Sequence, residues 1–203
     1  MPKPVLLIIA GCNGSGKSTF SQPLAPDNFT PFDYDSQFLR CYNSLIDSEF
    51  KEAMAHRMAF NELENQIKTA IETKSSFCYE TNFNSTPLHW PELFKNNGYD
   101  LHLFFLCLDS IQEAKKRVAI RVENGGHYVP EREIEKRYYD GYDNLNSFFD
   151  YFDYIDLFDS SKYLMHPTHI LSIESGKISS ITKTPDYLKT LIPDIIEKAN
   201  QIS

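Results

Sequence analysis

Residues 11–18 read GCNGSGKS and follow directly on the apolar run Val5–Ala10. They match the pattern G-x-x-x-x-G-K-[ST] without a gap, and the sequence predicts a helix from about Gly16 onward. Glycines let the backbone wrap closely around phosphate groups, and the helix adds the positive end of its dipole. The succession of strand, glycine-rich loop and helix therefore favours a nucleoside-triphosphate site over a chance glycine-rich turn.

This loop supplies the residues that we expect to bind ATP and Mg²⁺. Lys17 is expected to reach the β- and γ-phosphates, and the Ser18 hydroxyl is expected to bind Mg²⁺. The predicted nucleotide-binding residues are Gly11, Asn13, Gly14, Ser15, Gly16, Lys17, Ser18 and Thr19. The motif alone does not distinguish a kinase from other ATP-binding proteins.

Apolar runs of strand length alternate with longer amphipathic segments along the rest of the chain. This alternation predicts a single α/β domain over residues 1–203, a three-layer P-loop NTPase fold with a mostly parallel five-stranded sheet flanked by helices. The expected strands are residues 5–10, 32–34, 76–80, 101–108 and 154–158. Helices are expected at residues 49–74, 87–97, 111–122, 130–149 and 187–199. A C-terminal unit at about residues 168–200 combines a β-hairpin with the last helix.

Composition excludes several classes of protein. The 203 residues carry a formal net charge of −8, which argues against a protein that tracks a nucleic-acid backbone. The four cysteines form no CxxC pair and have no histidine at zinc-ligand spacing, so we expect free thiols in a reducing compartment. The apolar run at residues 5–10 is too short for a signal peptide or a membrane span, and we expect a cytoplasmic protein.

Polar residues follow the predicted second and third strands. Asp33 and Asp35 end the second strand, and Glu80-Thr81-Asn82 end the third. Ligands bind at the carboxyl edge of parallel strands, so these groups are candidates to bind an acceptor, remove its proton or organise Mg²⁺. The alternatives are that Asp35 caps the following helix and that Glu80 faces water.

Arginines concentrate in one segment. Four of the six, Arg117, Arg121, Arg132 and Arg137, fall between residues 117 and 137, around Gly125-Gly126-His127. We expect a lid at about residues 121–137 that closes over the phosphates, and we assign Arg117 to it as well. The alternative is that Arg117 and Arg132 pair with nearby Glu on solvated helix faces. His127 is expected to hydrogen-bond within the lid.

Two further residues are more simply explained by a structural role than by a functional one. Asp109 could organise a metal ion, but it follows a strand and precedes a helix, and we favour a helix cap. Trp90, on the helix expected after Pro87, is most simply part of the core.

The sequence resembles the zeta-toxin-like P-loop kinases, in particular their stand-alone branch described as predicted ABC-type ATPases. The segments that carry the resemblance are residues 11–19, 32–35, 79–82, 121–130 and 137–138, and the resemblance spans about residues 4–160. Zeta toxins use ATP·Mg²⁺ to phosphorylate a sugar hydroxyl of UDP-N-acetylglucosamine. The resemblance implies that Asp35 is the catalytic base, that Glu80 binds substrate, and that Arg121 and Arg137 act with Lys17 on the γ-phosphate.

The chain departs from zeta toxins near the acceptor. Zeta toxins have Glu-Gly-Thr where this chain has Glu80-Thr81-Asn82, and a basic residue where it has Asn84. We therefore expect a kinase that phosphorylates a small molecule, and a nucleotide sugar is one candidate for that acceptor. The alternatives are an ATP-hydrolysing switch without an acceptor and, least favoured by the net charge, a nucleic-acid-end kinase. Any antitoxin would be a separate protein.

Overall fold

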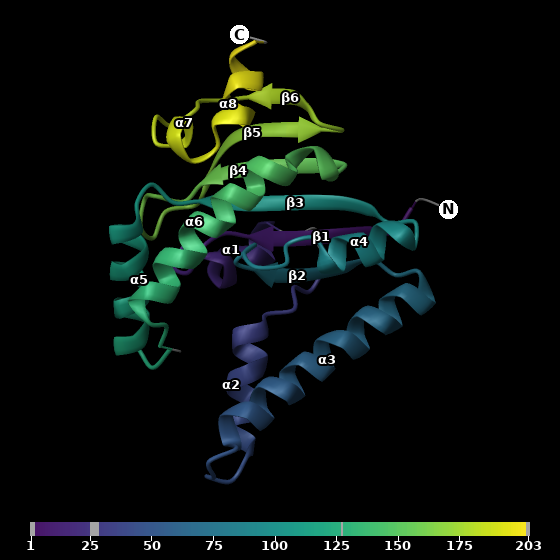
Figure 1. Ribbon diagram of the computed structural model, residues 1–203, viewed down its shortest axis with the longest axis vertical. Helices are drawn as coiled ribbons and strands as arrows, with labels where there is room; N and C mark the ends of the chain where they lie inside the picture. The colour runs from purple at the N-terminus through teal and green to yellow at the C-terminus, as the bar shows by residue number, and fades with distance from the viewer. Residues whose placement is uncertain (1–2, 25–28, 127, 202–203) are drawn as a thin grey trace.

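A computed structural model describes residues 3–24, 29–126 and 128–201. It is an α/β fold built on one six-stranded sheet with the order β2-β1-β3-β4-β5-β6. Helices flank the sheet, and a helical hairpin projects from one end of the molecule (Figure 1). The phosphate-loop strand therefore lies near the centre of the parallel part of the sheet.

The parallel part consists of β1 (Val5–Ala10), β2 (Phe77–Thr81), β3 (Asp100–Cys107) and β4 (Tyr154–Asp159). β1 pairs with both β2 and β3, so that Ala10 lies beside Thr81 and Phe105. The strand Val5–Ala10 is continuously apolar because both of its faces are covered. This pairing puts the end of β1, and the loop that follows it, beside the polar residues that end β2.

The antiparallel part consists of β5 (Thr168–Glu174) and β6 (Lys177–Ile181), which extend the sheet beyond β4 as a hairpin. The predicted C-terminal hairpin is thus confirmed. The predicted strand at residues 32–34 is wrong: only Phe32 pairs, in a parallel bridge to Tyr79. Asp33 ends the pairing because its side chain caps the helix that begins at the next residue.

The helices follow the predicted segments closely, with one break. They are α1 (Lys17–Leu24), α4 (His89–Asn96), α5 (Ile111–Glu123) and α6 (Glu131–Phe148), the last followed by a 3₁₀ turn. The single helix predicted over residues 187–199 is instead α7 (Leu188–Leu191) and α8 (Pro193–Asn200). Pro193 cannot donate the backbone hydrogen bond that would continue α7.

Side chains of β1 alternate between two apolar clusters. Leu6 and Ile8 join the main core, in which α6 contributes Tyr138, Tyr142 and Leu145. Leu7 and Ile9 join a small cluster on the other face of the sheet. The four cysteines are free and buried, as expected of small apolar side chains. No helix among the described residues is long and apolar enough to cross a membrane.

The projecting hairpin consists of α2 (Tyr34–Ser44) and α3 (Lys51–Thr73), and it has a core of its own (Figure 1). That core is formed by Phe38, Cys41, Ala55 and Ala59. The inner half of α3 packs on the sheet through buried side chains that include Leu63 and Ile67. The hairpin is therefore a separate packing unit attached to the sheet by its base.

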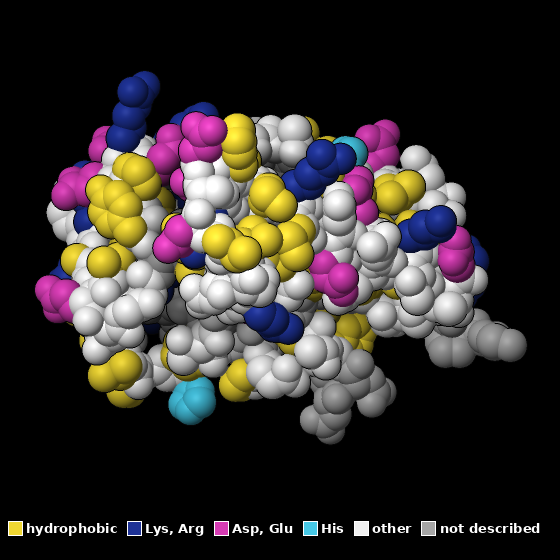
Figure 2. Space-filling model, turned by 90° about the horizontal axis from the view of Figure 1, so that it is seen from below, with side chains coloured by type: hydrophobic (Ala, Val, Ile, Leu, Met, Phe, Trp, Pro, Cys, Tyr) yellow, Lys and Arg dark blue, Asp and Glu magenta, His cyan; other side chains and the backbone are white. Residues whose placement is uncertain are grey.

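The outer half of α3 buries its alanines Ala55 and Ala59 but leaves its larger apolar side chains exposed. Phe50, Met54 and Met58 continue the spacing of four that predicts the helix, yet they are 62%, 48% and 42% exposed. Figure 2, which views the molecule from the side of this hairpin, shows hydrophobic side chains scattered among charged ones. The spacing predicts the helix correctly, but the side chains at this spacing are buried only in its inner half.

Candidate active site

The phosphate loop adopts a backbone that needs its glycines. Gly11, Gly14 and Gly16 have φ values of 146°, 82° and 93°, which side chains other than glycine rarely adopt. A Cβ atom at Gly11 would lie 2.7 Å from the Leu106 carbonyl oxygen, and one at Gly14 would lie 2.9 Å from that of Ala114. The loop is thus held against β3 and α5 by contacts that leave no room for a side chain.

Lys17 spans the loop and reaches the end of β2. Its Nζ donates to the carbonyl oxygens of Gly11 and Cys12, at 2.6 and 3.0 Å, and to Asn82 Oδ1 at 3.0 Å. Loss of hydration lowers the pKa of Lys17, and the negative groups nearby, Glu80 and Asp35 among them, oppose this shift. The ammonium group is therefore anchored between the phosphate loop and the polar residues after β2.

Glu80 contacts the residue expected to bind Mg²⁺. The Ser18 hydroxyl donates to Glu80 Oε2 at 2.9 Å. Burial raises the pKa of the Glu80 carboxyl, helped by the negative charge of Asp33. The predicted alternative, in which Glu80 faces water, is wrong, because the carboxylate lines the same cavity as the phosphate loop.

The oxygen groups around Ser18 fit Mg²⁺ chemically. No group of three or more His, Cys, Asp or Glu side chains within the described ranges could hold a metal ion by itself. Mg²⁺ does not require such a group, because it keeps several waters and binds through one or two protein oxygens together with phosphates. Ser18 and Glu80 are the residues that would serve it here.

Asp33 and Asp35 have different positions although they are two residues apart. Asp33 caps α2: it accepts from the Ser36 backbone N–H at 3.1 Å and from the Ser36 hydroxyl at 2.7 Å. The interpretation of Asp35 as the cap is therefore wrong. Asp35 lies in the first turn of α2 and lines the cavity, and its side chain has no hydrogen bond or ion pair with another residue of the described ranges.

Arg117 holds the walls of the site together. Its guanidinium pairs with Glu113 at 2.8 Å and donates to the carbonyl oxygens of Ser160 and Ser161, at 2.9 and 2.8 Å, and of Gly14 at 3.4 Å. The predicted pairing with Glu is present, but the helix face is buried and not solvated. These contacts describe a fixed clamp on the phosphate loop, so Arg117 is not part of a movable lid.

The Gly125-Gly126 pair stops α5. The Gly126 N–H donates to the Arg121 carbonyl at 2.9 Å, the Gly125 N–H donates to that of Val122 at 2.9 Å, and Gly125 has a φ of 83°. These two bonds form a Schellman motif, a common helix C-terminus. His127 lies outside the described residues.

The remaining predicted residues take positions around the same cavity. Arg121 lines it from α5, and Arg137 lines it from α6 and donates to Asn13 Oδ1 at 3.3 Å. Thr81 also lines it, and its hydroxyl accepts from the Phe83 N–H at 3.0 Å. Asp109 does not line it and does not cap α5, because Ser110 is the cap.

One cavity of about 740 Å³ is lined by most of the predicted site residues, although not by Gly11, Ser15, Asp109, Gly125 or Gly126. Sequence reasoning missed much of its lining, above all the side chains that come from α3, from the loop after β2 and from the loop between β4 and β5. The missed lining residues are Phe20, Tyr34, His56, Phe60, Leu63, Tyr79, Ser85, Thr86, Pro87, His89, Trp90, Ile120, Asn124, Lys162, Tyr163 and Leu164. Trp90 is only partly buried, so its assignment to the core was incomplete. The spacing of His56, Phe60 and Leu63 was a usable signal, since it puts them on one face of α3.

The fold and the phosphate loop define the chain as a P-loop protein. The family model described as Zeta toxin matches residues 1–161, and the chain belongs to this family. No curated protein sequence matches it.

Solved structures share the fold at low sequence identity. A chain of the AvrRxo1-ORF1:AvrRxo1-ORF2 complex is 14% identical with a TM-score of 0.71; the match covers 94% of this chain and 64% of that one. A chain of the PezAT toxin–antitoxin system of Streptococcus pneumoniae is 16% identical with a TM-score of 0.61, over 100% of this chain and 85% of that one. A chain of the Pnkp1/Rnl/Hen1 RNA repair complex is 24% identical with a TM-score of 0.58; the match covers 73% of this chain and 47% of that one. This chain thus spans less than two thirds of the length of the first and the third.

Proposed function

We propose that the protein is an ATP·Mg²⁺-dependent kinase that transfers the γ-phosphate to a hydroxyl group of a small molecule. The single observation that carries this proposal is the position of Asp35. Its carboxylate lines the cavity that also holds Lys17 and Ser18, and no other described residue pairs with it. A base that removes the proton from an acceptor hydroxyl must be accessible to the acceptor and must lie close to the phosphates.

In the proposed reaction, the acceptor oxygen forms a bond to the γ-phosphorus while the bond to the β-phosphate oxygen breaks. Asp35 takes the hydroxyl proton, and ADP leaves. Lys17, Arg121 and Arg137 bind phosphate oxygens, and Ser18 would hold Mg²⁺, which would supply positive charge to neutralise the phosphates. Glu80 orients the Ser18 hydroxyl, while Thr81 and Asn82 line the acceptor side of the site.

A transfer assay tests this proposal. The purified protein is incubated with ATP·Mg²⁺ and a panel of small hydroxyl compounds, and mass spectrometry follows the mass of each compound. The panel includes UDP-N-acetylglucosamine, because the family resemblance makes it a candidate. We expect one compound to gain a phosphate with the wild type and none with Asp35→Asn. That variant should still bind the nucleotide, because its side chain keeps its size and removes a negative charge near the phosphates.

Phosphate transfer by Asp35→Asn at the wild-type rate would refute the assigned role. Hydrolysis of ATP without transfer to any compound would favour an ATP-dependent switch.

We also infer regulation by a separate antitoxin protein in the cytoplasm. The likeness to a toxin–antitoxin system supports the antitoxin. The four buried free thiols support a reducing compartment such as the cytoplasm. Expression of the wild type alone should then slow the growth of a host cell, and expression of Asp35→Asn should not. Equal growth of the two cultures would argue against a toxin.

A further inference from the structure

The cavity has two chemically different sides. The Lys and Arg residues that line it all come from the phosphate loop, α5, α6 and the loop between β4 and β5. They are Lys17, Arg117, Arg121, Arg137 and Lys162. This is the side on which a nucleoside triphosphate would have its charge neutralised.

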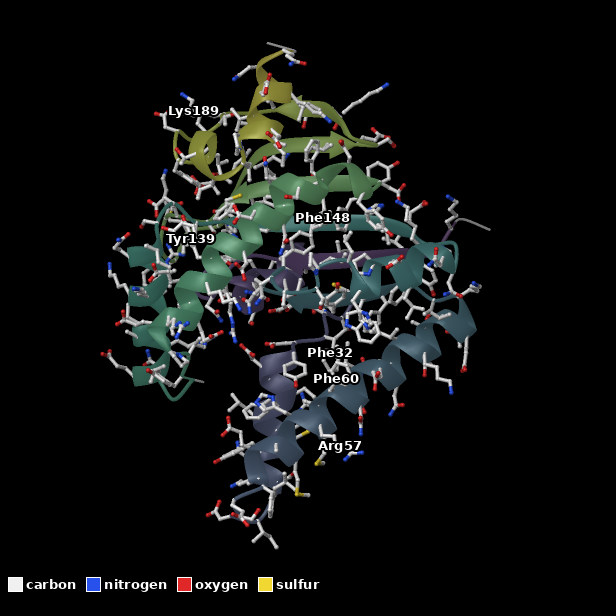
Figure 3. The ribbon with its side chains drawn as sticks, in the orientation of Figure 1. Phe32, Arg57, Phe60, Tyr139, Phe148 and Lys189 are labelled. Carbon is white, nitrogen blue, oxygen red and sulfur yellow. The ribbon has the colours of Figure 1, made fainter. Side chains whose placement is uncertain are left out.

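The other side is formed by α2, α3 and residues 84–90, and it is rich in aromatic rings. Tyr34, Phe60 and Trp90 line it. The rings of Phe60 and Trp90 lie 6.2 Å apart, and Phe60 remains 43% exposed. Figure 3 shows Phe60 near the base of the helical hairpin, with Arg57 one turn closer to the tip. Large apolar rings left open in a cavity are typical of a site that stacks on a planar ligand.

This aromatic side carries no positive side chain from Lys or Arg among the residues described. Arg40 and Arg57, the arginines of α2 and α3, are exposed and do not line the cavity. The positions outside the described ranges contain neither Lys nor Arg. An acceptor phosphate bound against these rings would therefore have no Lys or Arg to pair with, and would meet only the imidazoles of His56 and His89.

Two carboxylates increase the difference in charge between the cationic side and the aromatic side of the cavity. Asp33 and Asp35 line the cavity from the start of α2, next to the aromatic side. A phosphate there would meet like charges, which weakens its binding. Neutral polar groups are instead present in Asn84, Ser85 and Thr86, which can donate to and accept from the edge of a heteroaromatic ring.

We propose that the acceptor is a neutral hydroxyl-bearing molecule with a planar aromatic ring, and specifically a nucleoside that carries no phosphate. The inference rests on the proposed kinase function for the transfer step, but the binding site stands on the cavity alone. The ring stacks beside Phe60 and Trp90. A sugar hydroxyl then faces Asp35, and the bound ATP supplies the only phosphates in the cavity.

Trp90 provides the measurement, because it is the only tryptophan of the chain and lines the aromatic side. The protein is first saturated with ADP·Mg²⁺, so that the nucleotide side is occupied. Its Trp fluorescence is then titrated with adenosine, guanosine, cytidine, uridine and thymidine, with their 5′-monophosphates, and with UDP-N-acetylglucosamine. We expect at least one nucleoside to change the fluorescence, with an affinity at least tenfold higher than that of its monophosphate.

Two variants and a control locate the effect. Phe60→Ala should weaken nucleoside binding roughly five- to hundredfold, the range found for loss of one base-stacking side chain. Asn84→Arg adds a cation to the aromatic side and should raise the affinity for the monophosphate relative to the nucleoside. Met58→Ala, on the same helix but outside the cavity lining, should change neither affinity.

The proposal is overturned if no nucleoside changes the Trp90 fluorescence, or if the monophosphates or UDP-N-acetylglucosamine bind more tightly than the nucleosides. Failure of the kinase function looks different. In that case nucleosides would bind as expected, but mass spectrometry would detect no phosphate on them after incubation with ATP·Mg²⁺. The two results are obtained on the same preparation and are independent of each other.

Discussion

At the scale of single residues, Glu80 combines burial with a hydrogen bond from Ser18, the serine that we propose to bind Mg²⁺. Burial raises its pKa, so the folded protein holds the Glu80 proton more tightly than the unfolded chain, whose carboxyl has a pKa near 4.5. As the pH rises above that value, the unfolded chain releases the proton first, and the free energy of unfolding falls until the folded-state pKa is passed.

Glu80→Gln should remove this pH dependence. We expect the variant to gain stability relative to the wild type between pH 4.5 and neutrality, and to show little difference below pH 4.5, where the unfolded carboxyl is also protonated. Urea unfolding at a series of pH values measures this. A stability difference that is the same at pH 4 and pH 7 would show that burial of the charge is not its cause.

Arg117 gives the second prediction at this scale. Arg117→Ala leaves the carbonyl oxygens of Ser160 and Ser161 without their donor and leaves Glu113 without its partner. We expect a loss of about 3 kcal/mol in the free energy of unfolding, together with weaker nucleotide binding, because the clamp on Gly14 is lost. Arg132→Ala is the control, since Arg132 is exposed on α6, and should change stability by less than about 0.5 kcal/mol. Equal losses for the two variants would contradict the clamp.

At the scale of secondary-structure elements, the end of α5 sets the position of a cavity arginine. A Cβ atom at Gly126 would lie 2.5 Å from Arg121 Cγ and 2.9 Å from the Arg121 carbonyl oxygen, whereas one at Gly125 would meet nothing within 4 Å. Gly126→Ala must therefore move Arg121. Gly125→Ala strains only the backbone, because its φ is positive.

The two variants should separate catalysis from stability. We expect Gly126→Ala to lower the rate of phosphate transfer at least tenfold through the displaced Arg121. Gly125→Ala should cost about 1 kcal/mol of stability and keep most of the transfer rate. Steady-state kinetics and thermal unfolding of both proteins measure these effects. A greater loss of rate in Gly125→Ala would mean that this segment acts as a hinge.

The elements also show why some features follow from the sequence and others do not. The phosphate loop is local: its glycines, Lys17 and Ser18 are consecutive, so the sequence predicts the motif fully. Asp33 and Asp35 both follow the short pairing at Phe32, and only the backbone geometry decides which of them caps α2. Trp90 and Phe60 come from different helices, and their approach depends on how α3 meets the sheet.

At the scale of the whole molecule, the two packing units should differ in local stability. The main core extends over the sheet, α4 and α6, while the outer hairpin relies on a cluster of four buried side chains. Local opening requires less free energy where fewer apolar groups are buried. Amide hydrogens of α3 near Ala55 should therefore exchange faster with solvent than those of β1 and β3, although all of them are hydrogen-bonded.

Ligands should then protect different parts of the chain, and this tests the two-sided cavity as a whole. ADP·Mg²⁺ should slow hydrogen exchange in the phosphate loop and at the end of α5, because it fills the cationic side. A nucleoside added afterwards should slow exchange in α2, around Phe60 and around Trp90. It should leave the exposed outer turns of α3 near Phe50 unchanged, because they do not line the cavity. Mass spectrometry of peptic fragments resolves these segments. Protection by the nucleoside confined to α5 and α6 would place it on the cationic side and contradict the assignment of the aromatic side to the acceptor.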